Sequence, residues 1–219
     1  MQDDVAALIR VVAVMRPDVL CVQEAPRFFN WRDRRVALAD ACGMTVAAGG
    51  RLGGVAVYAG PRARVLHAED HVLKIFLGLE IRGLALAVVE VGGHRLAVGS
   101  IHLDLNGSAR LFHATEAVAL VSAAAATQGA IPVIAGDLNE HDDEPAWRYL
   151  AGRLTDCYPA RPSGDGLTFT SRNPRERIDA IFAGSGLSVV SCGVPPAVPA
   201  DLGAATDHRP VVAELGLGP

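Results

Sequence analysis

The sequence predicts a mixed α/β protein in which two β-sheets pack face to face and helices lie outside. Predicted strands outnumber helices and do not alternate regularly with them, as the strands of a parallel α/β sheet would. Half of the 219 residues are hydrophobic, which is enough for a sizeable core. Nothing repeats and no linker divides the chain, so residues 1–219 are expected to form a single domain.

The composition carries no sign of a strongly charged partner. The formal net charge is −4, so the basic surplus typical of proteins that neutralise many phosphates is missing. The four cysteines lack CxxC spacing, and we interpret them as buried free thiols.

Membrane and export signals are also missing from the sequence. No apolar stretch reaches the roughly 20 residues of a membrane span, and no signal peptide precedes the first predicted helix. We therefore expect no transmembrane segment and favour the cytoplasm, although an incomplete N-terminus could have removed a signal peptide. The sequence leaves the oligomeric state open.

The N-terminal part predicts a helix, a strand and a second helix. Residues 3–15 place apolar side chains at helical spacing, with Asp3 or Asp4 as a cap and Pro17 as the stop. Residues 18–24, DVLCVQE, read as a short buried strand that ends in a glutamate. Residues 27–43 have helical potential.

The middle of the chain predicts several strands and the strongest helix. Residues 53–60 form a strand, residues 74–83 and 84–93 a hairpin, and residues 94–106 an apolar strand with a polar end. A helix follows over residues 108–126, with Ser108 as its N-cap.

The C-terminal part alternates short strands with turns. Residues 131–139 predict a strand and residues 144–152 a short helix. Three later strands are separated by Pro- and Gly-rich turns, at residues 167–171, 177–184 and 211–215.

Several of these strands end in charged or amide residues. Each has an ordinary explanation alone: an Asp after Gly is usually a turn residue, and a His in an apolar strand is usually a hydrogen-bonded core residue. Together they are harder to dismiss, because buried carboxylates are costly unless they are paired or bind a metal. The set comprises Gln23-Glu24, His102, Asp137 with Asn139, Asp179, and Asp207-His208.

This set of residue types is suited to hydrolysis of a phosphate ester. Carboxylates and an amide suit Mg²⁺, and a His beside an Asp suits proton transfer or charge stabilisation near neutral pH. A metal ion, an oriented water and cationic histidines together describe phosphate-ester cleavage. The sequence lacks HExxH, a P-loop and GxSxG, which speaks against a zinc peptidase, a P-loop NTPase and an α/β-hydrolase.

Five segments in order resemble the motif series of the endonuclease/exonuclease/phosphatase superfamily: PDVLCVQE, SIHLDL, IAGDLN, RIDAIF and TDHRPV. This superfamily includes DNase I-like nucleases, apurinic endonucleases, neutral sphingomyelinases and inositol phosphatases. Single motifs such as GDLN are weak, but the ordered series spans residues 5 to 215. The resemblance implies a four-layered α/β sandwich, with two mostly antiparallel sheets face to face and helices outside.

The resemblance also implies roles for the polar strand ends. Glu24 would be the principal ligand of Mg²⁺, with Mn²⁺ as an alternative, and Asp207 would complete the metal site directly or through water. Asp137 would orient or deprotonate the attacking water, and Asn139 would hold a phosphate oxygen.

Two histidines and a third carboxylate complete the implied site. His208 would contact the scissile phosphate, and Asp179 would orient and polarise His208 through a hydrogen bond. His102 would contact a phosphate oxygen.

The sequence departs from the family pattern at its start. The family begins with a strand that supplies an Asn near the metal, whereas this sequence starts with the following helix. The chain could be a shortened version, a natural variant with another group in place of the Asn, or a member with weakened catalysis. Because that strand lies inside a sheet, its loss is expected to expose backbone groups and to lower stability or promote association.

A basic and aromatic segment follows Glu24. Its arginines could form the solvent-exposed face of a helix or bind substrate phosphate: Arg27, Arg32, Arg34 and Arg35. Its aromatic residues (Phe28, Phe29 and Trp31) could stack on a base, contact lipid or, as the preferred interpretation, pack against the sandwich.

The sequence thus predicts a Mg²⁺-dependent phosphodiesterase or nuclease-like enzyme acting on a phosphate ester, with nucleic acid among the candidate substrates. A phosphatase for lipid headgroups or small molecules is the alternative, although no exposed apolar loop is evident in the sequence. A catalytically weakened binding module is a further alternative, because the first strand and its Asn are missing.

Overall fold

The largest sheet of the protein has six strands and carries the centre of the fold. A computed structural model describes residues 4–196 and 199–217. The strands of this sheet follow the order β4 (Arg64–Val72), β5 (Gly83–Val91), β6 (His94–His102), β7 (Ile131–Asp137), β10 (Asp179–Ala183) and β8 (Thr155–Asp156). Only the β6–β7 pair is parallel, and the other neighbours run antiparallel.

Two three-stranded sheets form the neighbouring layer. One has the order β1 (Val19–Val22), β3 (Ala56–Ala59), β2 (Thr45–Ala48), and the other β12 (Val212–Leu217), β11 (Leu187–Gly193), β9 (Pro162–Ser163). Side chains of both sheets, including Val57 and Leu215, pack in one apolar cluster with Val89, Val98 and Val133 of the six-stranded sheet. Among the described residues, β1 and β12 are each paired on one side only.

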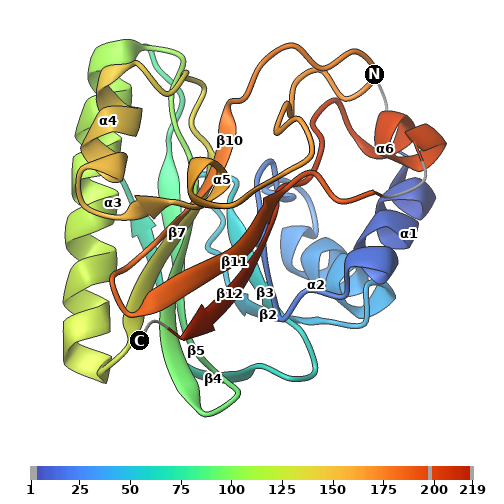
Figure 1. The fold of residues 1–219 in the computed structure, drawn as a ribbon, viewed down its shortest axis with the longest axis horizontal. Coiled ribbons are helices and arrows are strands. Elements are labelled where there is room, and N and C mark those ends of the chain that lie inside the picture. Colours follow the sequence, from blue (N-terminus) through green and yellow to red (C-terminus); the bar gives the residue numbers. More distant parts are fainter. Residues whose placement is uncertain (1–3, 197–198, 218–219) are drawn as a thin grey trace.

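Helices cover both outer surfaces (Figure 1). The helices α3 (Gly107–Gln128) and α4 (Pro145–Ala151) lie against the six-stranded sheet, and α1 (Val5–Met15), α2 (Trp31–Ala41) and α6 (Pro199–Ala205) lie beyond the smaller sheets. A short helix, α5 (Cys157–Ala160), connects β8 to β9. The arrangement is the predicted sandwich with two β layers inside and helices outside. Within the described ranges, no helix is both long and apolar enough to cross a membrane.

The predicted helices are confirmed, with one corrected cap. Asp4 caps α1 by accepting hydrogen bonds from the N–H groups of Ala6 and Ala7. The cap of α3 is Asn106 rather than Ser108, because the Asn106 side chain accepts from the N–H groups of Ser108 and Ala109.

Two predicted strands are wrong. Residues 74–82 form a loop, and the hairpin partner of β5 is β4, whose alternating polar residues made residues 64–72 a weaker strand pattern. Residues 167–171 form only isolated bridges at Phe169. The strands β2, β8, β9 and β11 were not predicted. Three of them, β2, β8 and β9, are four residues or shorter, so they depend on the strands beside them rather than on their own sequence.

Candidate active site

The polar ends of three neighbouring strands form the centre of the candidate site. The register pairs His102 of β6 with Asp137 of β7, and Asp137 with Asp179 of β10. Directly paired residues point to the same face of a sheet. The three side chains therefore stand in a row on the face that the smaller sheets cover.

Gly136 allows β6 and β7 to approach each other at this row. A Cβ at this position would collide with the backbone carbonyl oxygen of Ile101 on β6. Its φ of +153° is also one that other residues rarely adopt. The glycine in the GDLN segment is therefore required by the backbone that presents Asp137.

Asp137 is the most contacted carboxylate of the site. It is 5% exposed, and its Oδ2 lies 3.3 Å from His102 Nε2 and 3.9 Å from His208 Nε2. Its Oδ1 accepts a hydrogen bond of 2.8 Å from the N–H of Asn139. Asn139 has a left-handed backbone, and its Nδ2 donates to the carbonyl of Leu103 at 3.1 Å. The amide of Asn139 thus ties the loop after β7 to the loop after β6.

His208 reaches the row from the segment before β12. Its Nδ1 lies 2.9 Å from Asp179 Oδ2, and the ring of Phe169 lies against its imidazole, with 4.9 Å between the ring centroids. The structure thus brings together His102, Asp137, Asp179 and His208, four of the residues predicted from the sequence.

The two histidines have opposite electrostatic environments. Burial, with the charges of Arg82 and His208, lowers the pKa of His102 to about 3. Burial also lowers the pKa of His208, but the hydrogen bond and charge of Asp179 outweigh it and raise the value to about 9. At neutral pH His102 is therefore uncharged and His208 is a cation.

Asp137 is poised between its two protonation states. Burial and the charge of Asp179 raise the pKa of Asp137 to about 7, against the lowering effect of the Asn139 N–H. A carboxylate with a pKa near neutrality can accept and return a proton under physiological conditions.

Glu24 and Asp207, the predicted metal ligands, are both exposed. Glu24 follows β1 with a left-handed backbone (φ +52°), and Asp207 is next to His208. Their assignment as metal ligands stays a prediction.

A divalent cation fits the donor chemistry of the site. In the part of the chain that the structure describes, the group able to share a cation is Asp137, Asp179 and His208, with one ligand atom from each within 4.8 Å of the others. Oxygen donors suit Mg²⁺ or Mn²⁺. His208 uses Nδ1 for Asp179, so the oxygen donors are the carboxylates, and a cation beside them would offset their mutual repulsion.

Arg82 is a charged neighbour that the sequence analysis missed. It is 6% exposed, with its Nε 3.7 Å from Asp104 Oδ2 and its Nη2 3.4 Å from Glu80. Arg82 lies in the segment predicted as a strand, so no motif marked it. Its guanidinium adds positive charge beside His102.

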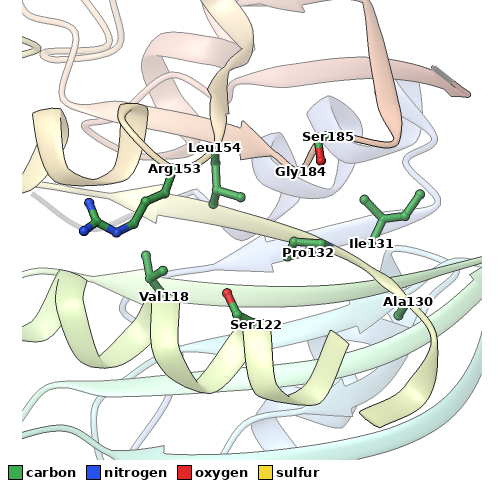
Figure 2. A pocket seen from close by; sticks show the side chains of 9 residues that line it. All are labelled: Val118, Ser122, Ala130, Ile131, Pro132, Arg153, Leu154, Gly184 and Ser185. Atoms are coloured by element: carbon green, nitrogen blue, oxygen red, sulfur yellow. The ribbon is translucent and has the colours of Figure 1, made fainter. Parts of the chain in front are cut away.

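A hollow at the other end of the sheet is separate from this site (Figure 2). It lies between α3, the start of β7 and the turn after β10, with Val118, Ile131, Arg153 and Ser185 among its lining residues. Asp137 ends β7 and Asp179 begins β10, so the strands separate the hollow from the carboxylates by their full length.

The chain resembles known proteins both in sequence and in fold. A family model described as the Endonuclease/Exonuclease/phosphatase family matches residues 1–208. No curated protein matches the sequence.

Several solved structures share the fold of this chain. A family protein from Bacteroides vulgatus has a TM-score of 0.78 at 20% identity, covering 96% of this chain and 91% of that chain. A mannosyl-6-phosphatase from Bacteroides thetaiotaomicron has a TM-score of 0.82 at 18% identity, covering 97% and 90%. The human Nocturnin catalytic domain has a TM-score of 0.75 at 15% identity, covering 97% and 86%.

Proposed function

This chain belongs to the endonuclease/exonuclease/phosphatase family, and from that premise we propose that it is a divalent-metal-dependent hydrolase of phosphate esters. The observation that carries the proposal is the environment of Asp137. Its buried carboxylate lies beside one neutral and one cationic imidazole, at the ends of adjacent strands.

In the proposed reaction Asp137 orients the attacking water and accepts its proton. The pKa of Asp137, raised to about 7 by burial and by Asp179, suits this exchange. His208, held by Asp179, presents its Nε2–H to the negative charge that grows on the phosphoryl oxygens. His102, uncharged, contacts a phosphate oxygen through the same face of the sheet, and Asn139 keeps the Asp137 loop in place.

The ligands of the proposed cation are Glu24 and Asp207, together with the carboxylates of Asp137 and Asp179. A bound Mg²⁺ or Mn²⁺ would polarise a phosphoryl oxygen and make a water more acidic. The exposed positions of Glu24 and Asp207 leave both side chains free to turn toward the site.

A phosphodiester, such as the backbone of a nucleic acid, is our first substrate class, with lipid headgroups or small phosphorylated molecules as the alternative. Proteins of this fold act on unrelated substrates, so the fold alone does not choose among them. One similar structure is named a mannosyl-6-phosphatase, which is in line with the small-molecule alternative.

The test compares hydrolysis of bis-p-nitrophenyl phosphate, p-nitrophenyl phosphate and plasmid DNA, with Mg²⁺, Mn²⁺ or EDTA. His208→Ala should abolish metal-dependent turnover. His94→Ala is the matched control, because His94 begins the strand that His102 ends. Absence of turnover on every substrate, together with a melting temperature that Mg²⁺ does not move, would favour the binding-module alternative.

A further inference from the structure

Two loops continue from the strands that carry the buried half of the candidate site. The loop after β6 (residues 103–106) follows His102, and the loop after β7 (residues 138–144) follows Asp137 and contains Asn139. The pairing of β6 with β7 ends at His102 and Asp137. The position of Asn139 relative to Asp137 therefore depends on contacts made beyond the sheet.

Arg110, near the start of α3, joins these two loops. Its Nη1 donates a hydrogen bond of 2.9 Å to the carbonyl oxygen of Leu105, in the first loop. Its Nε donates to Glu140 Oε2 at 2.6 Å and its Nη2 donates to Glu144 Oε1 at 3.0 Å, both in the second loop. All three nitrogens of one rigid, planar guanidinium are used, so the group fixes the distance between the loops.

Glu140 connects the second loop to the core. It is 1% exposed, and its Oε1 accepts a hydrogen bond of 2.6 Å from the N–H of Trp147, in the first turn of α4. Trp147 is buried and its ring meets that of Phe182 of β10 edge to face. The helices α3 and α4 lie side by side on the outer face of the sheet (Figure 1). The turn that carries Asn139 thus ends in a side chain anchored between these two helices.

Stability alone does not explain this ion pair. Arg110 is 9% exposed, and taking two charges out of water costs about as much as their attraction returns, so an apolar pair of similar volume is often equally stable. A cation near the N-terminus of a helix is also unfavourable, because that end carries partial positive charge. An apolar pair could not supply the directed hydrogen bonds to Leu105 and Trp147.

The turn held in this way orients the central carboxylate of the site. The N–H of Asn139 donates to Asp137 Oδ1 at 2.8 Å, and its Nδ2 donates to the carbonyl oxygen of Leu103 at 3.1 Å. The φ of Asn139 is +50°, in the left-handed region that few residues other than glycine adopt. A displacement of this turn would rotate the Asp137 carboxylate, whose Oδ2 lies 3.3 Å from His102 Nε2.

We propose that Arg110 and Glu140 are positioning residues, which hold the loops after β6 and β7 so that Asn139 keeps the Asp137 carboxylate directed at the attacking water. They act through Asn139 rather than on the substrate. The inference rests on the proposed function and deepens it. A misplacement of about 1 Å in such a site can lower turnover by about 10².

Three variants test the role of the pair. Arg110→Met/Glu140→Gln removes both charges together, and Gln keeps an oxygen that can accept from the Trp147 N–H. Arg110→Lys keeps a charge for Glu140 but loses the planar fork. The matched control, Arg62→Met/Asp18→Asn, removes an exposed pair at the start of β1 whose Nε–Oδ1 distance is also 2.6 Å.

Kinetics on bis-p-nitrophenyl phosphate separate positioning from stability. We expect both Arg110 variants to melt close to the wild-type temperature. Their kcat should fall by about 10² for Arg110→Met/Glu140→Gln and at least about tenfold for Arg110→Lys, with KM changed less than about threefold. The control should keep the wild-type kcat. A wild-type kcat in either folded variant would overturn the inference, and so would a kcat that falls only with the folded fraction. Arg110→Lys decides if the double variant does not fold.

Hydrogen exchange tests the geometry without turnover. The amide of Asn139, which donates to Asp137, should exchange at least about tenfold faster in Arg110→Met/Glu140→Gln than in the wild type. Amides in the middle of β5 should keep their wild-type rates. Unchanged protection of Asn139 would overturn the inference, with or without turnover. Faster exchange at Asn139, in a protein whose wild type cleaves no phosphate ester, would support the positioning of the turn and count against the proposed function.

Discussion

His102, Asp137 and Asp179 stand on neighbouring strands of the six-stranded sheet, whereas Glu24 and Asp207 stand on segments next to strands of the two smaller sheets. The first group is held by a continuous ladder of backbone hydrogen bonds, and its side chains contact one another. The second group is exposed. Strand register thus preorganises the buried half of the candidate site, for which we propose acid–base roles.

The same contrast appears in the sheets themselves. β6 and β7 have hydrogen-bonded neighbours on both sides, but β1 and β12, in the described part of the chain, have one neighbour each. Both nonetheless pack on the same face of the large sheet. The layer formed by the two smaller sheets is therefore expected to open locally more easily than the six-stranded sheet.

The largest effect should come from the buried half. Asp137→Asn removes the proposed proton acceptor and should lower kcat/KM for bis-p-nitrophenyl phosphate by about 10³. Asp143→Asn, in the exposed loop that follows, is the control and should act like wild type. A loss below about tenfold for Asp137→Asn would show that another group takes the proton.

The close approach of β6 and β7 should dominate stability. Gly136→Ala forces a Cβ onto the Ile101 carbonyl and should lower the free energy of unfolding by roughly 3 kcal/mol. Gly92→Ala, in an open turn with φ +57°, should cost only about 1 kcal/mol. Urea titrations followed by circular dichroism measure both, and equal losses would mean that the sheet yields at Gly136.

Metal binding should test the exposed residues of the candidate site, Glu24 and Asp207. Mg²⁺ or Mn²⁺ at about 100 times its dissociation constant should stabilise the folded state by about 2.7 kcal/mol. Glu24→Gln should reduce this stabilisation while leaving the melting temperature in EDTA unchanged, because the side chain is exposed. Differential scanning calorimetry measures the difference, and an unaltered metal response in Glu24→Gln would remove Glu24 from the metal site.

The pH dependence should report on Asp137 and on its charged partner His208. The base is active when deprotonated, so kcat/KM should rise about tenfold per pH unit below the Asp137 pKa of about 7. It should fall above about pH 9, where His208 loses its proton. A bound cation would shift the acidic limb to lower pH.

Asp179→Asn sharpens this test. The carboxylate of Asp179 raises the pKa of His208, so its removal should move the alkaline limb to lower pH. An alkaline limb that stays in place would mean that a group other than His208 causes it.

The smallest effect should be seen in the sheet edges. Amide hydrogens of β1 and β12 that face away from β3 and β11 should exchange with solvent at least about tenfold faster than those of β6 and β7. Amides of β1 that face β3 serve as the internal control. Uniform protection across β1 would show that its open edge is covered in solution.

Residues that mark the chemistry could be found from the sequence alone. Apolar strands that end in His102 and Asp137 or begin at Asp179 are local patterns, and so is the Asp-His pair at 207–208. Local patterns failed where pairing decides the outcome, as for β2 and β9, or where an apolar run proved to be a loop, as at residues 74–82.

By itself, the sequence determined the layered α/β class, the helices α1 to α4 and the identity of the polar strand ends, because hydrophobic periodicity and residue chemistry are local properties. The tertiary structure alone decided the opposite charge states of His102 and His208 and the burial of Arg82. It also decided the exposure of Phe28 and Phe29, which the sequence predicted to pack against the sandwich. These depend on distances and desolvation between segments far apart in the chain, which only the packing of the sheets establishes.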